Sequence, residues 1–284
     1  MISDTNTHVC AICHNPTSVM MSGKILGKYH ILYYFCGNCK CIQTEKPYWI
    51  SEAYDSSIAV TDTGIMLRNM EICRDVFSII KRYFNPKVKV LDYGGGYGIL
   101  TRMLRDKGVD AYWSDKYSEN LLVKGFEYDG TDKVDIILAF EVVEHLENPM
   151  ETIREIMSKS DCFIFSVSTL PRFDFKTNQE WWYFAPETGQ HIFFPSDETL
   201  RWIANELGCR YYNLLGLHIF SKRKKFKIIC RLDLSFYRYV YLIKKRFVTN
   251  KKFVPKIWED NATMKNKLVI KYNNQSNEKS RENN

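Results

Sequence analysis

The stretch Val88-Lys-Val-Leu-Asp-Tyr-Gly-Gly-Gly-Tyr-Gly-Ile-Leu100 decides the fold of this chain. An apolar strand that ends in Asp92 runs into a turn with four glycines, and a helical pattern follows. Glycines allow the backbone to turn sharply and to approach a ligand closely, and the free N–H groups at a helix start face the same space. This order of elements is typical of an open α/β sheet that binds a ligand at the carboxyl ends of its strands.

The spacing of the glycines indicates the kind of ligand. Gly94, Gly96 and Gly98 form a G-x-G-x-G pattern, whereas G-x-G-x-x-G suits a pyrophosphate. Asp92 makes the strand end anionic, which favours a ligand with an ammonium group, such as the methionyl part of S-adenosylmethionine. Asp115 ends the next strand, where an acid can accept ribose hydroxyls. An ordinary glycine-rich turn and a surface acid are the alternative interpretations, but the two signals in this order favour a cofactor site.

Short apolar runs alternate with helical patterns through the middle of the chain, which predicts a mostly parallel sheet with helices between its strands. The expected strands are 88–93, 110–114, 134–140 and 162–168, and the expected helices are 99–107, 143–159 and 198–207. A further amphipathic helix is expected within 46–85, with Asp62 or Thr63 capping its start and Pro86 beyond its end.

The glycine stretch resembles motif I of class I S-adenosylmethionine-dependent methyltransferases. The segment 135–149 resembles the fourth strand and following turn of the ubiquinone-pathway O-methyltransferases, and the whole resemblance spans residues 50–220. It implies a Rossmann-like methyltransferase core, and it places residues 127–129 beside the adenine. The cofactor-binding residues that it implies are Asp92, Gly94, Gly96, Gly98, Asp115 and Phe140.

Glu141, Glu144 and His145 follow the strand expected to end at Phe140. If a helix begins there, the three side chains converge, and with His191 they make a set of ligands suited to Mg²⁺ or Mn²⁺. Similar Glu-x-x-Glu-His motifs bind a divalent metal in some ubiquinone-pathway methyltransferases and in terminal-ribose O-methyltransferases of small RNAs. Two alternatives stay open: the acids face the cofactor or cap a helix, or one histidine is a general base.

Aromatic residues surround His191 in the segment 181–195. They suit stacking on a sugar ring or a base, or equally a hydrophobic plug on the core. The segment resembles that of bacterial methyltransferases linked with surface-carbohydrate modification. This resemblance favours a glycan or another small molecule as the substrate.

The N-terminal segment 1–45 carries two C-x2-C pairs, Cys10 with Cys13 and Cys36 with Cys39. Four thiolates with this spacing predict a tetrahedral structural zinc site of the zinc-ribbon type, and Cys41 could replace one ligand. The nine cysteines and the lack of a secretory signal favour a reducing compartment, the cytoplasm.

Similar zinc modules precede the core of sugar C-methyltransferases. In that family a Tyr after the module and a His past the core sheet serve the active site. Tyr54 and His191 are the positional analogues here, with Ser57 nearby. The resemblance therefore adds Tyr54 to the candidate catalytic residues His191 and His145.

The basic charge of the chain lies mostly in the segment 221–256. It holds thirteen Lys or Arg and one acid, interleaved with aromatic residues, in a chain of net charge +7. An anionic membrane surface, nucleic acid and plain packing on an acidic core are all open as its partner. The polar residues from 273 onward are expected to be disordered.

Three units are therefore expected: a zinc ribbon over 1–45, an α/β core over 46–220 and a basic C-terminal extension over 221–284. The predicted function is S-adenosylmethionine-dependent methylation of a carbohydrate or related hydroxyl by a cytoplasmic enzyme, with a membrane-peripheral location as the alternative. The first alternative is metal-assisted ribose O-methylation of RNA. The second is a catalytically inactive zinc-ribbon scaffold.

Overall fold

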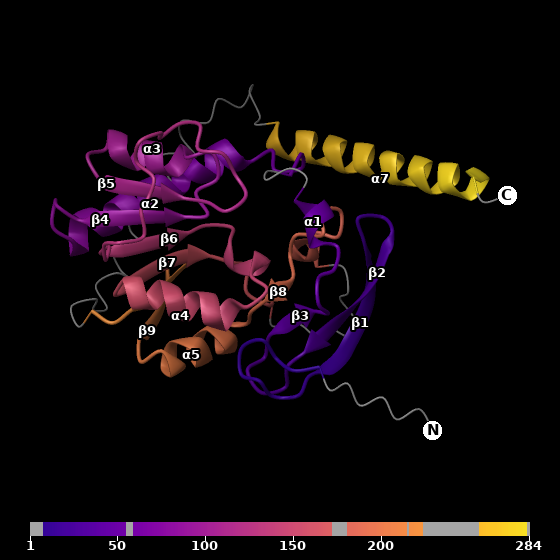
Figure 1. The fold of residues 1–284 in the computed structure, drawn as a ribbon, viewed down its shortest axis with the longest axis horizontal. Helices are drawn as coiled ribbons and strands as arrows, with labels where there is room; N and C mark the ends of the chain where they lie inside the picture. The colour runs from indigo at the N-terminus through magenta and orange to yellow at the C-terminus, as the bar shows by residue number, and fades with distance from the viewer. Residues whose placement is uncertain (1–7, 55–58, 172–180, 215, 224–255, 283–284) are drawn as a thin grey trace, which may run out of the picture.

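The computed structural model describes residues 8–54, 59–171, 181–214, 216–223 and 256–282 (Figure 1). Its central sheet has six strands in the order β5-β4-β6-β7-β10-β9. In chain order these are β4 (Lys89–Tyr93), β5 (Asp110–Ser114), β6 (Ile136–Ala139), β7 (Cys162–Ser166), β9 (Arg210–Leu214) and β10 (Leu217–Ser221). The first four are parallel neighbours, and β10 pairs antiparallel with β7 and β9. The four parallel strands are the four that the sequence predicts.

Helices cover both faces of this sheet, as Figure 1 shows. They are α2 (Ile65–Tyr83) and α3 (Ile99–Asp106) on one face, and α4 (Pro149–Lys159) and α5 (Asp197–Glu206) on the other. Side chains alternate along each strand, so that Ile136 and Leu138 pack toward α2 and α3 while Ile137 and Ala139 pack toward α4 and α5. Because both faces are covered, the central strand β6 is apolar throughout.

The expected helix over 143–159 is interrupted. A short 3₁₀ turn, η1 (Val143–His145), comes first, and α4 begins only at Pro149. Proline at the first helical position lacks an N–H and pushes the preceding residue, Asn148, out of helical geometry. Glu141 therefore precedes the turn instead of sharing a helical face with His145.

A second, antiparallel sheet has the order β1-β2-β3-β8. Its strands are β1 (Ser18–Ile25), β2 (Tyr29–Phe35), β3 (Ile42–Thr44) and β8 (Phe193–Phe194). The last strand comes from far along the chain, and one apolar cluster runs from the cysteine module through this sheet to α4 and α5. We call residues 8–54 the N-terminal module; its short helix α1 (Ile50–Ala53) lies at its end. The module shares a continuous core with the central domain.

The C-terminal helix α7 (Ile257–Glu282) begins above α1 and runs over the N-terminal module in Figure 1. Asn261 Nδ2 donates to Thr61 O at 2.7 Å, and Lys265 Nζ lies 2.6 Å from the Glu187 carboxylate. Residues 273–282 belong to this helix, which differs from the disordered tail expected there. Most of the basic segment, 224–255, lies outside the described residues. Within the described part, no helix has both the length and the apolar character needed to cross a bilayer.

Candidate functional site

The glycine turn after β4 is shaped by its neighbours. Gly94 and Gly98 have φ of +72° and +89°, and a Cβ on them would lie 2.5 Å from Val142 Cγ2 and 2.7 Å from Val123 Cγ1, respectively. Gly96, with φ +54°, has nothing within 4 Å of such a Cβ. The first and third glycines therefore permit close packing, whereas the middle one faces open space where a ligand can approach.

Asp92 lies buried beneath this turn. Its Oδ2 accepts a hydrogen bond from Thr101 Oγ1 at 2.7 Å, in the first turn of α3. Burial raises the pKa of Asp92 to about 6, and the Thr101 hydroxyl offsets part of that rise. A nearby cation would therefore stabilise the carboxylate form of Asp92 and lower its pKa.

Asp115 holds the glycine turn to the end of β5. Its Oδ2 accepts from Gly96 N at 2.9 Å, and its Oδ1 accepts from Tyr117 N and Ser118 N at 2.7 Å each. A carboxylate offers about four acceptor sites, so these three bonds leave one on Oδ2. Asp115 can therefore bind one further donor without losing its structural bonds.

A cavity of about 610 Å³ joins the glycine turn to the turn after β6. This volume falls within the usual range of small-molecule sites. Its lining includes the predicted residues Tyr54, Asp92, Gly94, Gly96, Asp115, Phe140, Glu141 and His145, together with Arg68, Tyr117 and Gln190. Residues 127–129 do not line it: Asn120 Nδ2 and Gly125 N donate to the Glu127 carboxylate, which lies at a separate small pocket. The expectation that 127–129 flank the adenine is therefore not supported.

Glu141 stands apart from the other members of its motif. It has φ +56°, and its Oε1 accepts from Ser166 Oγ at 2.7 Å, on the neighbouring strand end. Burial and the nearby Glu144 charge raise the pKa of Glu141, while Arg68 offsets part of the rise. Glu141 is not among the three side chains whose possible ligand atoms converge. Its expected role as a metal ligand is therefore not supported.

Those three side chains are Glu144, His145 and His191, with ligand atoms all within 4.8 Å of one another. Glu144 is fully buried, and its Oε1 accepts from Tyr183 Oη at 2.6 Å. Its Oε2 is buried without a hydrogen-bond partner in the described structure. An unpaired buried carboxylate oxygen is costly, so this atom marks a place where a donor or a cation fits.

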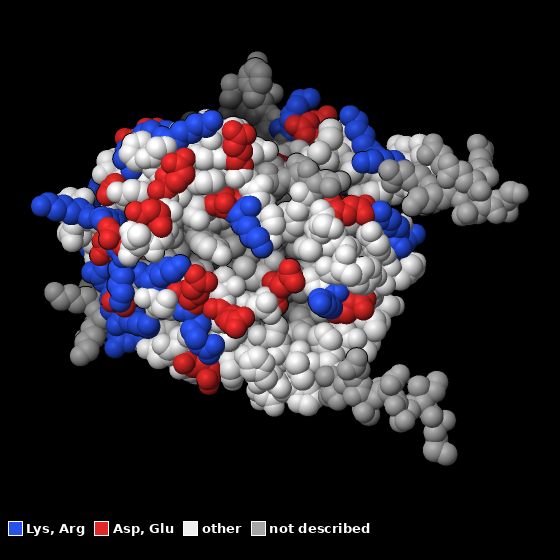
Figure 2. Space-filling view, viewed as in Figure 1, with Lys and Arg blue, Asp and Glu red and all other residues white. Residues whose placement is uncertain are grey.

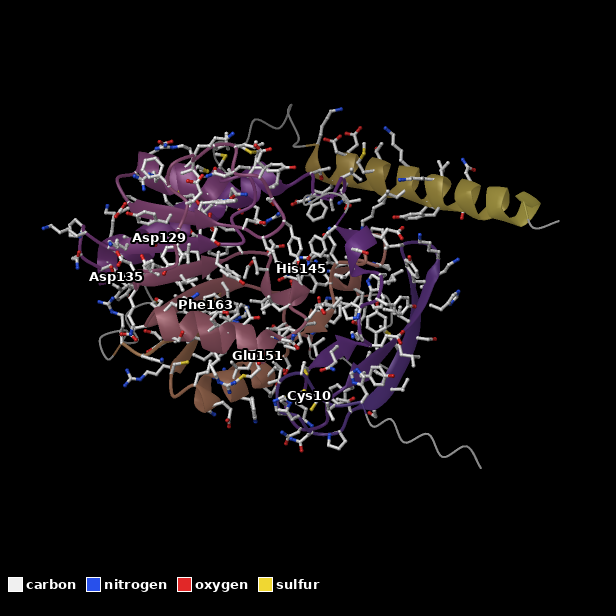
Figure 3. The ribbon with its side chains drawn as sticks, in the orientation of Figure 1. Cys10, Asp129, Asp135, His145, Glu151 and Phe163 are labelled. Carbon is white, nitrogen blue, oxygen red and sulfur yellow. The ribbon has the colours of Figure 1, made fainter. Side chains whose placement is uncertain are left out.

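The two histidines are held in one tautomer. His145 Nδ1 lies 3.0 Å from Gln190 O, and His191 Nδ1 lies 2.7 Å from Tyr183 O. Because a carbonyl only accepts, each Nδ1 carries a proton, and in the neutral ring Nε2 is then the nitrogen with the lone pair. The ring centroids are 4.9 Å apart, and burial together with His191 lowers the pKa of His145 to about 3. Both imidazoles therefore present Nε2 as an acceptor or a ligand, and Figure 3 places His145 between the central domain and the module.

Tyr54 forms part of the cavity wall beside these rings. Its ring stacks on Tyr117 at 4.6 Å and meets His145 edge-on at 6.1 Å. Burial raises the pKa of Tyr54, so its phenol stays protonated near neutral pH. Tyr54 can thus donate a hydrogen bond in the cavity. Ser57 lies outside the described residues.

The predicted cysteine ligands also converge. The Sγ atoms of Cys10, Cys13, Cys36 and Cys39 lie within 4.8 Å of one another. The two pairs have matching backbone turns: His14 N donates to Cys10 O and Lys40 N donates to Cys36 O, both at 3.0 Å.

A fifth thiol, Cys41, lies beside this cluster. Its Sγ is 3.4 Å from that of Cys10 and 3.6 Å from that of Cys39. Hydrogen bonding with Cys41 lowers the pKa of Cys36, whereas hydrogen bonding with Cys10 raises the pKa of Cys39.

Sequence reasoning missed the partners of these side chains. No sequence motif marks Tyr183, Gln190 or Arg68 as a partner of the site residues. Tyr183 lies inside the aromatic segment 181–195, but no spacing rule links it to Glu144. Arg68 forms a bidentate ion pair with Asp62, at 2.6 and 2.9 Å, on the cavity wall.

A family model described as a methyltransferase domain matches residues 66–214, just over half of the chain. No curated protein sequence matches the chain. Among solved structures, the magnesium protoporphyrin IX methyltransferase of Synechocystis PCC 6803, with bound S-adenosylhomocysteine, is 18% identical, with a TM-score of 0.42 over 60% of this chain and 90% of that one. A putative methyltransferase of Bacillus halodurans C-125 is 13% identical, with a TM-score of 0.41 over 50% and 70%.

Proposed function

The chain belongs to the family of methyltransferase domains, and from this premise we propose that it transfers a methyl group from S-adenosylmethionine to a hydroxyl of a neutral carbohydrate or related small molecule. The observation that carries the proposal is one cavity with a glycine turn at one end and a histidine at the other. We call residues 92–98 with Asp115 the cofactor end. The acceptor end comprises His145 and Gln190, which line the cavity, together with Glu144, Tyr183 and His191, which cluster with His145 outside the cavity lining.

The residues at the cofactor end fit S-adenosylmethionine, whose sulfonium supplies an electrophilic methyl group. Gly96 leaves room for close approach of the ligand to the main chain, and the N-terminus of α3 lies beside it. Asp92 provides negative charge near the ammonium group, and the remaining acceptor site on Asp115 suits one ribose hydroxyl. Phe140 forms an apolar wall at the end of β6.

The residues at the acceptor end fit a divalent ion. His145, His191 and Glu144 each bring one possible ligand atom within 4.8 Å of the others, and Glu144 keeps Oε2 unpaired, so together they offer a two-histidine, one-carboxylate set. Carbonyl partners on both Nδ1 atoms are the usual way in which proteins orient such ligands. Such an ion would acidify an acceptor hydroxyl. Without one, a histidine Nε2 can accept the hydroxyl proton directly.

The charges around the cavity disfavour an anionic acceptor. Acids in the lining outnumber bases: Asp62, Asp92, Asp115, Glu141 and Glu147 stand against Arg68 and Lys116. Figure 2 shows both acidic and basic side chains around the centre of this face, and the lining itself holds more acids than bases. A phosphodiester backbone would be repelled there. The described part of the chain thus supports a small neutral acceptor over RNA, the alternative that the basic segment suggests.

The test is calorimetric titration of S-adenosylhomocysteine into the full chain, followed by transfer of labelled methyl from S-adenosylmethionine to a panel of glycosides and RNAs. We expect micromolar binding, methylation of a neutral glycoside, and stimulation by Mn²⁺ that Glu144→Gln removes. Methylation of RNA with a steep loss at rising salt would favour the ribose alternative. Cofactor binding without transfer to any acceptor would favour the inactive scaffold.

A further inference from the structure

The loop that carries His191 is held in part by the N-terminal module, although it lies far from the module in sequence. Its backbone carbonyls accept hydrogen bonds from the module at three places. These bonds are Leu26 N to Pro186 O at 2.8 Å, Trp49 Nε1 to Gly189 O at 2.8 Å, and Thr44 N to Ile192 O at 3.0 Å. The loop therefore takes its position from the module as much as from the central sheet.

Gln190 connects the module directly to the acceptor end. Its side-chain Nε2 donates to Ala53 O at 2.7 Å, and its backbone oxygen accepts from His145 Nδ1 at 3.0 Å. Gln190 is 8% exposed, so the amide has little water to replace a lost partner. The place of the Gln190 carbonyl, and with it the orientation of the His145 ring, depends on the module.

A second connection starts at the cysteine cluster. The side chain of Gln43 on β3 accepts from Ala11 N at 2.8 Å and donates to Val9 O at 3.0 Å, which fixes the first cysteine turn. Gln43 also pairs with Phe193 of β8, two residues after His191. The β3–β8 strand pair therefore connects the first cysteine turn to the segment that carries His191.

We propose that the N-terminal module is a working part of the active site, with Gln190 and the β3–β8 pair as positioning elements. A thiophilic divalent ion of the zinc class at Cys10, Cys13, Cys36 and Cys39 keeps both histidines in the Nδ1–H tautomer. This inference depends on the proposed function only where it gives the His145 and His191 rings a role in catalysis. The positioning itself can be measured without substrate, cofactor or a second metal.

The experiment is long-range ¹H–¹⁵N NMR of the histidine rings in the zinc-loaded full chain, with signals assigned through His145→Gln and His191→Gln. We expect both rings as Nδ1–H tautomers. In Gln190→Ala the His145 ring should lose the single tautomer, and zinc removal by a chelator should disturb both rings. The matched control is Tyr272→Phe, which removes the bond from α7 to Glu187 O of the same loop and should leave both rings unchanged.

Kinetics and cofactor affinity distinguish a loss of histidine positioning in Gln190→Ala from a general loss of folding. Gln190→Ala should lower kcat by about 10- to 100-fold, as for other residues that orient active-site imidazoles, while the Kd of S-adenosylhomocysteine stays within about twofold. Unchanged ring tautomers in Gln190→Ala would overturn the proposal, even if the zinc-free chain unfolds. Absence of methyl transfer by the wild type would instead overturn the proposed function and leave the NMR result standing.

Discussion

The two ends of the cavity are assembled from the chain in different ways. The cofactor end comes from one short stretch, where Gly96 of the glycine turn donates to Asp115 at the end of β5 and Thr101 of α3 donates to Asp92. The acceptor end is built from segments far apart in sequence, with Tyr183 bonded to Glu144 and Gln190 to Ala53. If the proposals above hold, cofactor binding depends on local backbone geometry, whereas acceptor chemistry depends on the N-terminal module.

Removing the thiolate cluster is the strongest way to break this comparison. Cys10→Ser with Cys36→Ser should release zinc and cost on the order of 10 kcal/mol of metal-coupled folding free energy in the module. Turnover should be lost, while the affinity for S-adenosylhomocysteine stays within about twofold. Metal analysis and calorimetry measure both, with Cys209→Ser as the control thiol outside the cluster. Cofactor binding that disappears together with zinc would mean that the two ends form one unit.

His191→Ala tests the acceptor end alone. We expect turnover to fall by about 10²- to 10⁴-fold, the usual contribution of a positioned acid, base or metal ligand, with unchanged cofactor affinity. His30→Ala, a change at an exposed histidine of the module, is the control. Steady-state kinetics and calorimetry give the two quantities. Normal turnover in His191→Ala would remove this residue from the active site.

Gly98→Ala tests the backbone of the cofactor end. A side chain in the left-handed region costs about 1–2 kcal/mol, and the contact at 2.7 Å with Val123 adds about 1–3 kcal/mol. Gly108→Ala is the matched control, because Gly108 has φ +84° but open space around it. Urea denaturation should show a larger loss of stability for Gly98→Ala. Equal losses would mean that the Val123 contact relaxes freely.

The parts of the fold that sequence predicts are those with local signals. The four parallel strands and the glycine turn follow from apolar runs and glycine spacing, which need no distant partner. The break at Pro149 also had a local cause, yet the apolar pattern of 143–159 obscured it. Strand β8 could not be predicted, because two residues carry too little pattern and their partner, β3, lies about 150 positions earlier.

The candidate site divides along the same line. The residue types and their spacing predicted the glycine turn, both acids of the cofactor end and both histidines. The hydrogen bonds that give the histidines their tautomer come from backbone carbonyls of Gln190 and Tyr183, which have no residue-specific signal. The sequence therefore predicts the candidate functional side chains better than it predicts the hydrogen-bond partners that orient them.

The pH dependence of cofactor affinity is the smallest expected effect, and it isolates Asp92. In the folded chain without ligand, burial raises the pKa of Asp92 to about 6, above its ordinary value of 3.8. The native state then binds a proton more tightly than the unfolded chain, so this group lowers stability as pH rises from about 4 to 6. A ligand with an ammonium group prefers the carboxylate, so its binding should change with the opposite sign.

Affinity for S-adenosylhomocysteine should therefore be constant above about pH 7 and should fall below pH 6, by at most about tenfold for each pH unit. Calorimetry between pH 5 and 8 measures the slope. Asp92→Asn keeps the shape of the side chain but cannot ionise, so it should bind weakly and without this slope. A slope that persists in Asp92→Asn would assign the proton to another group, and Asp92 would then serve only to hold Thr101 and the start of α3.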